Sequence, residues 1–66
     1  MVYTYEVFVD MKEYEDTQSS NARISSVRYE IDADTKRTLD AIARHCATTD
    51  YPNVSEYDIR VTRRLP

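Results

Sequence analysis

Alternating apolar and polar residues at the start of the chain predict a β-strand over residues 2–10. One parity is wholly apolar and consists of Tyr3, Tyr5, Val7 and Val9. The other parity is mixed, because Val2 and Phe8 alternate there with polar residues. We therefore expect a strand with one inward face and a back that is half apolar.

Two later segments, residues 24–33 and residues 55–65, show the same alternation and are predicted to be strands. In the first of them Ile24 lies off parity, which predicts a bulge near Ser25 and Ser26. In the second, Arg63 interrupts the apolar parity. The apolar parities are Val27, Tyr29, Ile31 and Ala33 in the first segment, and Tyr57, Ile59, Val61 and Leu65 in the second.

Between these two strands the apolar spacing changes to that of a helix over residues 35–48. Asp34 or Thr35 is expected to cap its N-terminus by accepting a backbone N–H bond. Pro52 cannot continue a helix and marks the end of this segment. The apolar stripe at helical spacing consists of Leu39, Ile42, Ala43, Cys46 and Ala47.

Residues 11–22 show no sustained period, so we predict a long hairpin loop there. The segment holds three acidic residues and one basic residue, and it continues into a polar Ser-Ser-Asn run. A loop of this length without structure of its own is often functional or disordered.

The element order β-β-α-β predicts one small α+β domain over residues 1–66. The strand–helix–strand crossover makes its two strands run in the same direction, and such a crossover is expected to be right-handed. The first strand has the most apolar character and suits the centre, which gives a three-stranded antiparallel sheet of order 2-1-3. The single helix covers one face and leaves the other open. The predicted core is Tyr5, Val7, Val9, Val27, Tyr29, Ile31, Leu39, Ile42, Ala43, Cys46, Ile59 and Val61.

The two outer strands of such a sheet are edges with unpaired backbone groups. We expect one of them to mediate self-association or partner binding. The strand over residues 55–65 is predicted to be the better protected edge, because it carries Arg60, Arg63 and Arg64.

Composition narrows the class of protein. With 66 residues and one Cys, the chain has a marginal core and no internal disulfide. No apolar run approaches the ~18 residues of a membrane-spanning helix, and the first residues lack the basic and apolar regions of a signal peptide. The chain has no Gly, which excludes glycine-rich nucleotide-binding loops. Turns that require a positive φ must then use Asn21, Asp50 or Asn53.

The residues that most often carry catalysis are sparse here. His45 lies off the apolar stripe of the helix, as a surface histidine does. Cys46 lies within the stripe, where a cysteine packs as a small apolar residue rather than acting as a nucleophile. A structural zinc site needs about four ligands of these types. We therefore expect no catalytic residue, no metal and no cofactor, and a protein that is not an enzyme.

Charge is unevenly distributed along the chain. Residues 1–34 carry a balance of −5 and residues 35–66 a balance of +2, within a net charge of −3. Phe8 with Arg28 and Arg60 on the open sheet face would imitate a nucleic-acid site. The same face is predicted to hold six acids, so phosphates would be repelled and direct nucleic-acid binding is disfavoured. These acids are Glu6, Asp10, Glu30, Asp32, Glu56 and Asp58.

Residues 27–66 resemble a known family in layout. An alternating strand leads into a helix of the form Thr-x-x-x-Leu-Asp-Ala-Ile-Ala and then into the strand Tyr-Asp-Ile-Arg-Val-Thr-Arg-Arg-Leu-Pro. This order resembles the small inhibitor of bacterial RNA polymerase from certain podophages. It rests on Leu39-Asp40-Ala41 and Val61-Thr62-Arg63, and the acidic hairpin segment departs from that family's pattern. The small sheet-plus-helix build is also similar to several anti-CRISPR proteins.

The resemblance implies a small, acidic, non-enzymatic viral protein that disables a host complex by binding it. A Cas effector is the first expected partner, because an acidic hairpin suits a basic nucleic-acid channel. RNA polymerase is the second. The rival classes are a small dimeric transcription regulator or antitoxin, and a tiny enzyme. The expected protein is a monomer or weak homodimer in the cytoplasm of the bacterial host, without a membrane partner.

The expected partner-binding residues fall into two groups. The first is the acidic hairpin tip, with Tyr14 as its aromatic anchor. The second is the arginine end of the last strand together with the open sheet face around Phe8. The full set is Asp10, Glu13, Tyr14, Glu15 and Asp16 in the first group, and Phe8, Arg60, Arg63 and Arg64 in the second.

Overall fold

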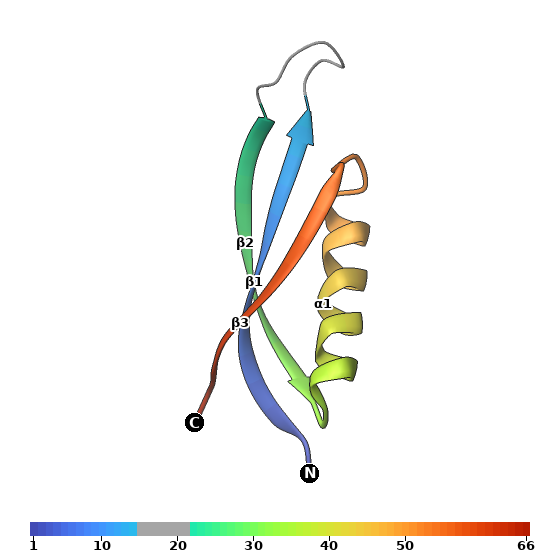
Figure 1. Cartoon of the computed structure of the whole chain (residues 1–66). Coiled ribbons are helices and arrows are strands. Elements are labelled where there is room, and N and C mark those ends of the chain that lie inside the picture. Colours follow the sequence, from blue (N-terminus) through green and yellow to red (C-terminus); the bar gives the residue numbers. More distant parts are fainter. Residues whose placement is uncertain (15–21) are drawn as a thin grey trace.

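A computed structural model describes residues 1–14 and 22–66 of the chain. Three antiparallel strands form one sheet, and a single helix packs on one face of it (Figure 1). The strand order is β2-β1-β3, so the first strand is central and the predicted α+β fold is confirmed. The elements are β1 (Tyr3–Tyr14), β2 (Ala22–Ala33), α1 (Lys36–Asp50) and β3 (Glu56–Arg64).

The hairpin of β1 and β2 is longer than predicted. Residues 11–14 continue β1 and pair in register with residues 22–25 of β2. The prediction of a loop over 11–22 is therefore wrong at both of its ends, and residues 15–21 lie outside the described part of the chain. Met11 continues the inward parity of β1 and is buried. Beyond it the side chains are polar, so backbone pairing with β2 extends the strand where apolar burial does not.

The predicted bulge at Ser25 and Ser26 is also wrong. Pairing between β1 and β2 is regular through both residues, and Ile24 lies opposite Lys12 with 67% of its surface exposed. The irregularity lies between β1 and β3 instead. Val7 faces Val61 while Glu6 faces Arg63, so β3 carries one extra residue at this point. That residue is Thr62. The bulge explains why Arg63 interrupts the apolar alternation of this strand in the sequence.

The core lies between α1 and the covered face of the sheet. Val61 was predicted to belong to it but is 38% exposed, because α1 packs more against β2 than against β3. Cys46 is only partly buried. The buried residues are Val7, Val9, Met11, Ile31, Ala33, Leu39, Ala43 and Ala47. Packed against them and partly buried are Tyr5, Val27, Tyr29, Ile42, Val54, Tyr57 and Ile59.

The ends of α1 follow from its sequence. Thr35 is the N-cap, and its hydroxyl oxygen accepts a 3.1 Å hydrogen bond from the Thr38 N–H. At the other end the Tyr51 N–H donates to the Ala47 carbonyl at 2.8 Å, and Pro52 follows. Within residues 1–14 and 22–66, no helix has the length and apolar character needed to cross a membrane.

The described backbone needs no glycine. None of its residues has a positive φ: Asp50 is the last residue of α1, and Asn53 lies in the turn that follows the helix. Neither of these two candidates is therefore needed for a turn of positive φ, and Asn21, the third candidate, lies outside the described residues.

Candidate protein-binding surface

The face of the sheet that points away from α1 carries most of the charged side chains of the strands. We call it the open face. All six acids predicted for this face lie on it. Two of them are even-numbered residues of β1, and the other four pair with even-numbered residues of β1. Its central residues are Glu6, Phe8, Asp10 and Lys12 of β1, Ile24, Ser26, Arg28, Glu30 and Asp32 of β2, and Glu56, Asp58, Arg60 and Arg63 of β3.

Glu6 is the centre of an ion-pair network on the open face. Its carboxylate lies 2.9 Å from the Arg28 guanidinium and 3.4 Å from that of Arg63, and its side chain is only 14% exposed. Arg28 also contacts Glu30 at 3.0 Å. Hydrogen bonds from Thr62 and then from Arg28 hold the pKa of the Glu6 carboxyl below its ordinary value. Glu6 and Glu30 therefore balance the charges of Arg28 and Arg63 within the sheet.

Arg60 is engaged in the same way. Its guanidinium lies 3.2 Å from the Asp10 carboxylate and 5.1 Å from the centre of the Phe8 ring. Ser26 donates a further hydrogen bond to Asp10. The bonds from Arg60 and then from Ser26 lower the pKa of the Asp10 carboxyl. Phe8 and Arg60, both predicted to bind a partner, thus also contact each other and stabilise the sheet.

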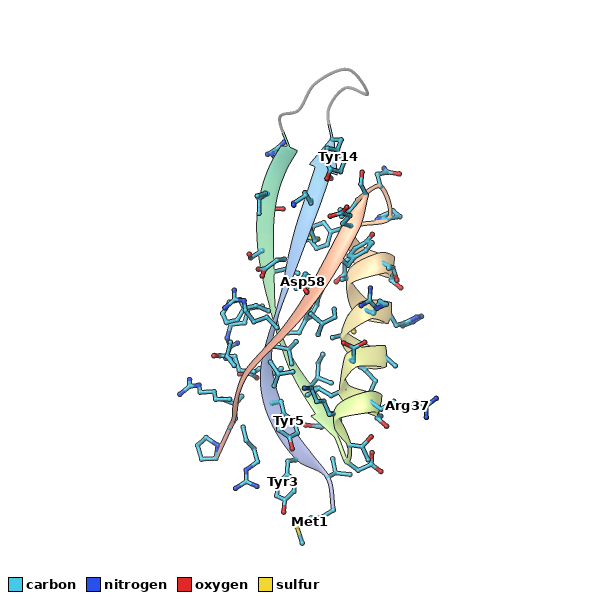
Figure 2. The ribbon with its side chains drawn as sticks, in the orientation of Figure 1. Met1, Tyr3, Tyr5, Tyr14, Arg37 and Asp58 are labelled. Atoms are coloured by element: carbon cyan, nitrogen blue, oxygen red, sulfur yellow. The ribbon has the colours of Figure 1, made fainter. Side chains whose placement is uncertain are left out.

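Arg64 completes the set of predicted arginines. Its guanidinium lies 4.4 Å from the centre of the Tyr3 ring. Tyr3 lies near the N-terminal end of β1 (Figure 2). With Arg63 on Glu6 and Arg60 on Asp10, each arginine of the predicted basic end has a partner within its own sheet. The basic group is brought together on β3, and two of its three arginines, Arg60 and Arg63, are paired with acids of the same sheet.

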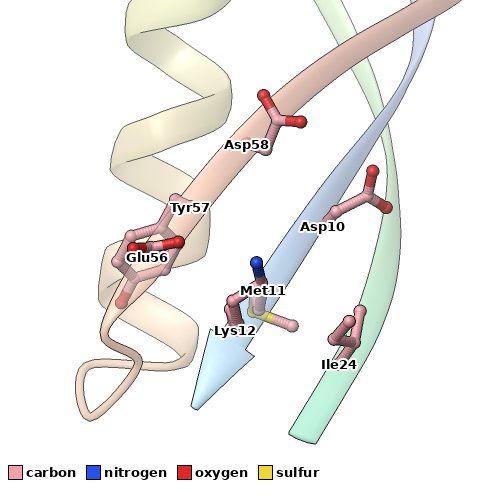
Figure 3. A pocket seen from close by; sticks show the side chains of 7 residues that line it. All are labelled: Asp10, Met11, Lys12, Ile24, Glu56, Tyr57 and Asp58. Atoms are coloured by element: carbon pink, nitrogen blue, oxygen red, sulfur yellow. The ribbon is translucent and has the colours of Figure 1, made fainter. Parts of the chain in front are cut away.

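Near the hairpin end, the open face is hollowed. The hollow has a volume of about 420 Å³, and carboxylates from two strands stand around it (Figure 3). Glu56 and Asp58 are exposed, and neither forms an ion pair with any residue that the structure describes. The lining residues are Asp10, Met11, Lys12, Ile24, Glu56, Tyr57 and Asp58.

The predicted hairpin-tip cluster is not one surface. Side chains alternate between the faces of a strand, so Asp10 and Tyr14 lie on the open face while Glu13 lies on the other. Tyr14 is exposed at the end of β1 (Figure 2). The remaining two members, Glu15 and Asp16, lie outside the described residues.

Sequence reasoning placed Glu56 and Asp58 on the correct face but did not include them among the binding residues. The missing information was register: between β3 and β1, Asp58 faces Asp10 and Glu56 faces Lys12. Only this pairing shows that the acids of β3 stand next to those of β1. Among the described residues, no three His, Cys, Asp or Glu side chains are placed to hold a metal ion.

Comparison with known protein families, with curated proteins and with solved structures gave no match to this chain.

Proposed function

We propose that this protein is a non-enzymatic inhibitor that binds a nucleic-acid-handling protein complex through the hairpin end of its open face. One observation supports this function above others. Arg28, Arg60 and Arg63 are held by acids of the same sheet, whereas Glu56 and Asp58 stand exposed beside the hollow. This end therefore presents an excess of negative charge, which complements a basic protein surface.

The target class follows from that charge. Proteins that hold nucleic acids present basic channels, and an acidic protein is attracted to them by their field. Residues 27–66 resemble a phage inhibitor of bacterial RNA polymerase, and the small sheet-plus-helix build is similar to anti-CRISPR proteins. A Cas effector is the first target to test, because an acidic hairpin suits a basic nucleic-acid channel, and RNA polymerase is the second. In this proposal the protein comes from a phage or mobile element and acts in the bacterial cytoplasm.

Purified targets give the most direct test. Cleavage of target DNA by a guide-loaded Cas effector and transcription by RNA polymerase are each measured against increasing concentrations of the protein. We expect one of the two activities to be inhibited, with direct binding to the inhibited complex. If the protein binds neither complex and instead shifts DNA in a gel, the alternative of a small transcription regulator replaces the proposal.

A charge reversal beside the hollow tests the surface. Glu56→Lys should weaken binding by about tenfold or more, because it places a like charge against a basic target. The matched control is Asp40→Lys, which makes the same charge change on α1, on the other side of the sheet. Equal binding by Glu56→Lys, Asp40→Lys and the parent would exclude the hairpin end as the binding surface.

A second pair of variants separates charge from apolar contact. Ile24→Lys and Ile24→Glu both remove the exposed apolar side chain from the edge of the hollow, and they introduce charges of opposite sign. Binding should be weaker for Ile24→Lys than for Ile24→Glu, and the difference should shrink as salt rises. An equal loss in both variants would indicate an apolar contact in place of electrostatic attraction.

A further inference from the structure

The outer edge of β3 has backbone groups directed away from the sheet. The Lys12 carbonyl accepts from the Ser55 N–H at 3.0 Å, and the Thr4 carbonyl accepts from the Leu65 N–H at 2.8 Å. Even-numbered residues of β1 therefore direct their backbone groups toward β3. Alternate residues of an antiparallel strand bond to the same neighbour. The residues of β3 whose N–H and C=O groups point to the free edge are thus Tyr57, Ile59 and Val61.

Charge along this edge changes sign at Ile59. Glu56 and Asp58 precede it, and Arg60 and Arg63 follow it. We propose that β3 pairs antiparallel with β3 of a second copy of this chain, about a two-fold axis at Ile59. The resulting dimer has one continuous six-stranded sheet. This inference is independent of the proposed inhibitory function, because it uses only the edge of β3.

The proposed register places unlike charges opposite each other. Asp58 faces Arg60 of the second copy on the open face, and the two-fold axis repeats the pair. These positions form a non-hydrogen-bonded pair, in which side chains of neighbouring strands approach most closely. Asp58 has no ion pair within the described residues, and Arg60 is exposed beyond its contact with Asp10.

Other registers are less favourable. Moving the axis by one residue toward the C-terminus sets Arg60 against its own copy, and moving it toward the N-terminus does the same to Asp58. Like charges directly opposite each other destabilise a strand pair. The register about Ile59 is therefore the one that the charge pattern selects.

Apolar contacts on the helix side of the sheet also favour the proposed pairing. Val61 is 38% exposed and lines a groove of about 270 Å³ with Tyr5, Lys36 and Leu39. In the proposed register Val61 faces Tyr57 of the second copy, and the two Ile59 side chains meet at the axis. These contacts cover apolar surface that α1 leaves exposed on β3.

The arginines do not protect this edge as the sequence predicted. Arg60 lies over Phe8, Arg63 contacts Glu6 and Arg64 lies over Tyr3, so all three are held against the faces of their own sheet. A single strand pair with its flanking side chains is small, so the dimer belongs with transient interfaces that bury less than about 1,200 Å².

Charge exchange between two variants tests the register. Sedimentation velocity over a range of concentrations should show a reversible dimer of the parent. Asp58→Lys and Arg60→Glu should each weaken self-association by about tenfold or more, because each sets like charges opposite each other. An equimolar mixture of the two should restore association, since both cross-strand pairs are then again of unlike charge. Asp32→Lys, on the open face of β2, is the control and should dimerise like the parent.

Cross-linking provides a second measurement that does not alter any ion pair. Opposed residues of a hydrogen-bonded pair lie ~5.5 Å apart at their Cα atoms, which suits a disulfide. In a Cys46→Ala background, Ile59→Cys should form an intermolecular disulfide faster than Val27→Cys, a matched position on β2. A parent that stays monomeric at all concentrations, a mixture that associates no better than its components, or equal cross-linking rates would each overturn the proposal.

Discussion

The Thr62 hydroxyl lies within hydrogen-bonding distance of two oxygens of Glu6, 3.1 Å from its main-chain carbonyl and 2.8 Å from its carboxylate. Thr62 is the extra residue of the β3 bulge, so its side chain fixes the bulge to the central strand. The bulge shifts the parity of β3 and brings Arg63 opposite Glu6. One inserted residue thus both completes the ion-pair network and lowers the pKa of its central acid.

That lowered pKa predicts an acid-dependent loss of stability. The folded state holds the pKa of Glu6 below its ordinary value of 4.5, so in this range the unfolded chain binds more protons. The resulting stabilisation is complete above pH 4.5 and is lost as the pH falls through the lower, folded pKa. The melting temperature should therefore fall less steeply for Glu6→Gln than for the parent as the pH is lowered from neutral to strongly acidic. Glu56→Gln is the control, and equal slopes for Glu6→Gln and the parent would contradict the role of the network.

Core truncation should have unequal effects at two positions of α1. Leu39 is 2% exposed, whereas Ile42 is only partly buried. Leu→Ala and Ile→Ala changes in cores cost about 2–5 kcal/mol, and a domain of this size has only ~3–5 kcal/mol of stability. Leu39→Ala should be largely unfolded by circular dichroism, and Ile42→Ala should keep more helix. The opposite order would show that α1 presents a different face to the sheet.

The helix cap gives a smaller and well-defined change. Thr35→Ala removes the oxygen that accepts from the Thr38 N–H, and it should lower the free energy of unfolding by about 1 kcal/mol. Thr35→Ser retains that oxygen and should stay close to the parent in urea denaturation. Loss of stability in both variants would assign the effect to the threonine methyl group instead.

Tyr29 should ionise later than an ordinary tyrosine. Burial, followed by the 2.7 Å hydrogen bond to Asp50, raises the pKa of its phenol above 10.0. The unfolded chain then loses this proton first, so stability should fall as the pH rises above 10.0. Ultraviolet titration of the parent should show one late tyrosine that is absent from Tyr29→Phe. Identical late phases in both would show that another tyrosine is responsible.

Much of the fold was predictable because apolar periodicity reports burial. The parity of Val7 and Val9 and the stripe of Leu39 and Ala43 identified the buried faces, and the β-β-α-β order then limited the topology. The extension of β1 beyond Met11 was not predictable in this way, because backbone pairing alone stabilises it. Val61 was misassigned to the core because periodicity gives the face of a strand but not how far the helix covers it.

The candidate site was less predictable than the fold. Charge composition indicated an acidic surface, and alternation placed Glu56 and Asp58 on the open face. Glu56 and Asp58 are unpaired within the described residues, whereas Glu6 and Asp10 are paired with arginines. Which arginine contacts which carboxylate depends on the register of the strands and on the bulge at Thr62. Neither is encoded in a short-range pattern of the sequence.

The absence of glycine also affects the unfolded state. Average usage would place roughly four or five Gly in a chain of this length. A non-glycine residue at a compatible position stabilises a protein by about 0.4–1 kcal/mol, because the unfolded chain then has fewer conformations to lose. Since no described residue needs a positive φ, this restriction does not strain the folded backbone. Over four or five positions it amounts to roughly 2–5 kcal/mol, comparable to the whole stability of so small a domain. It arises from the unfolded chain before any contact forms.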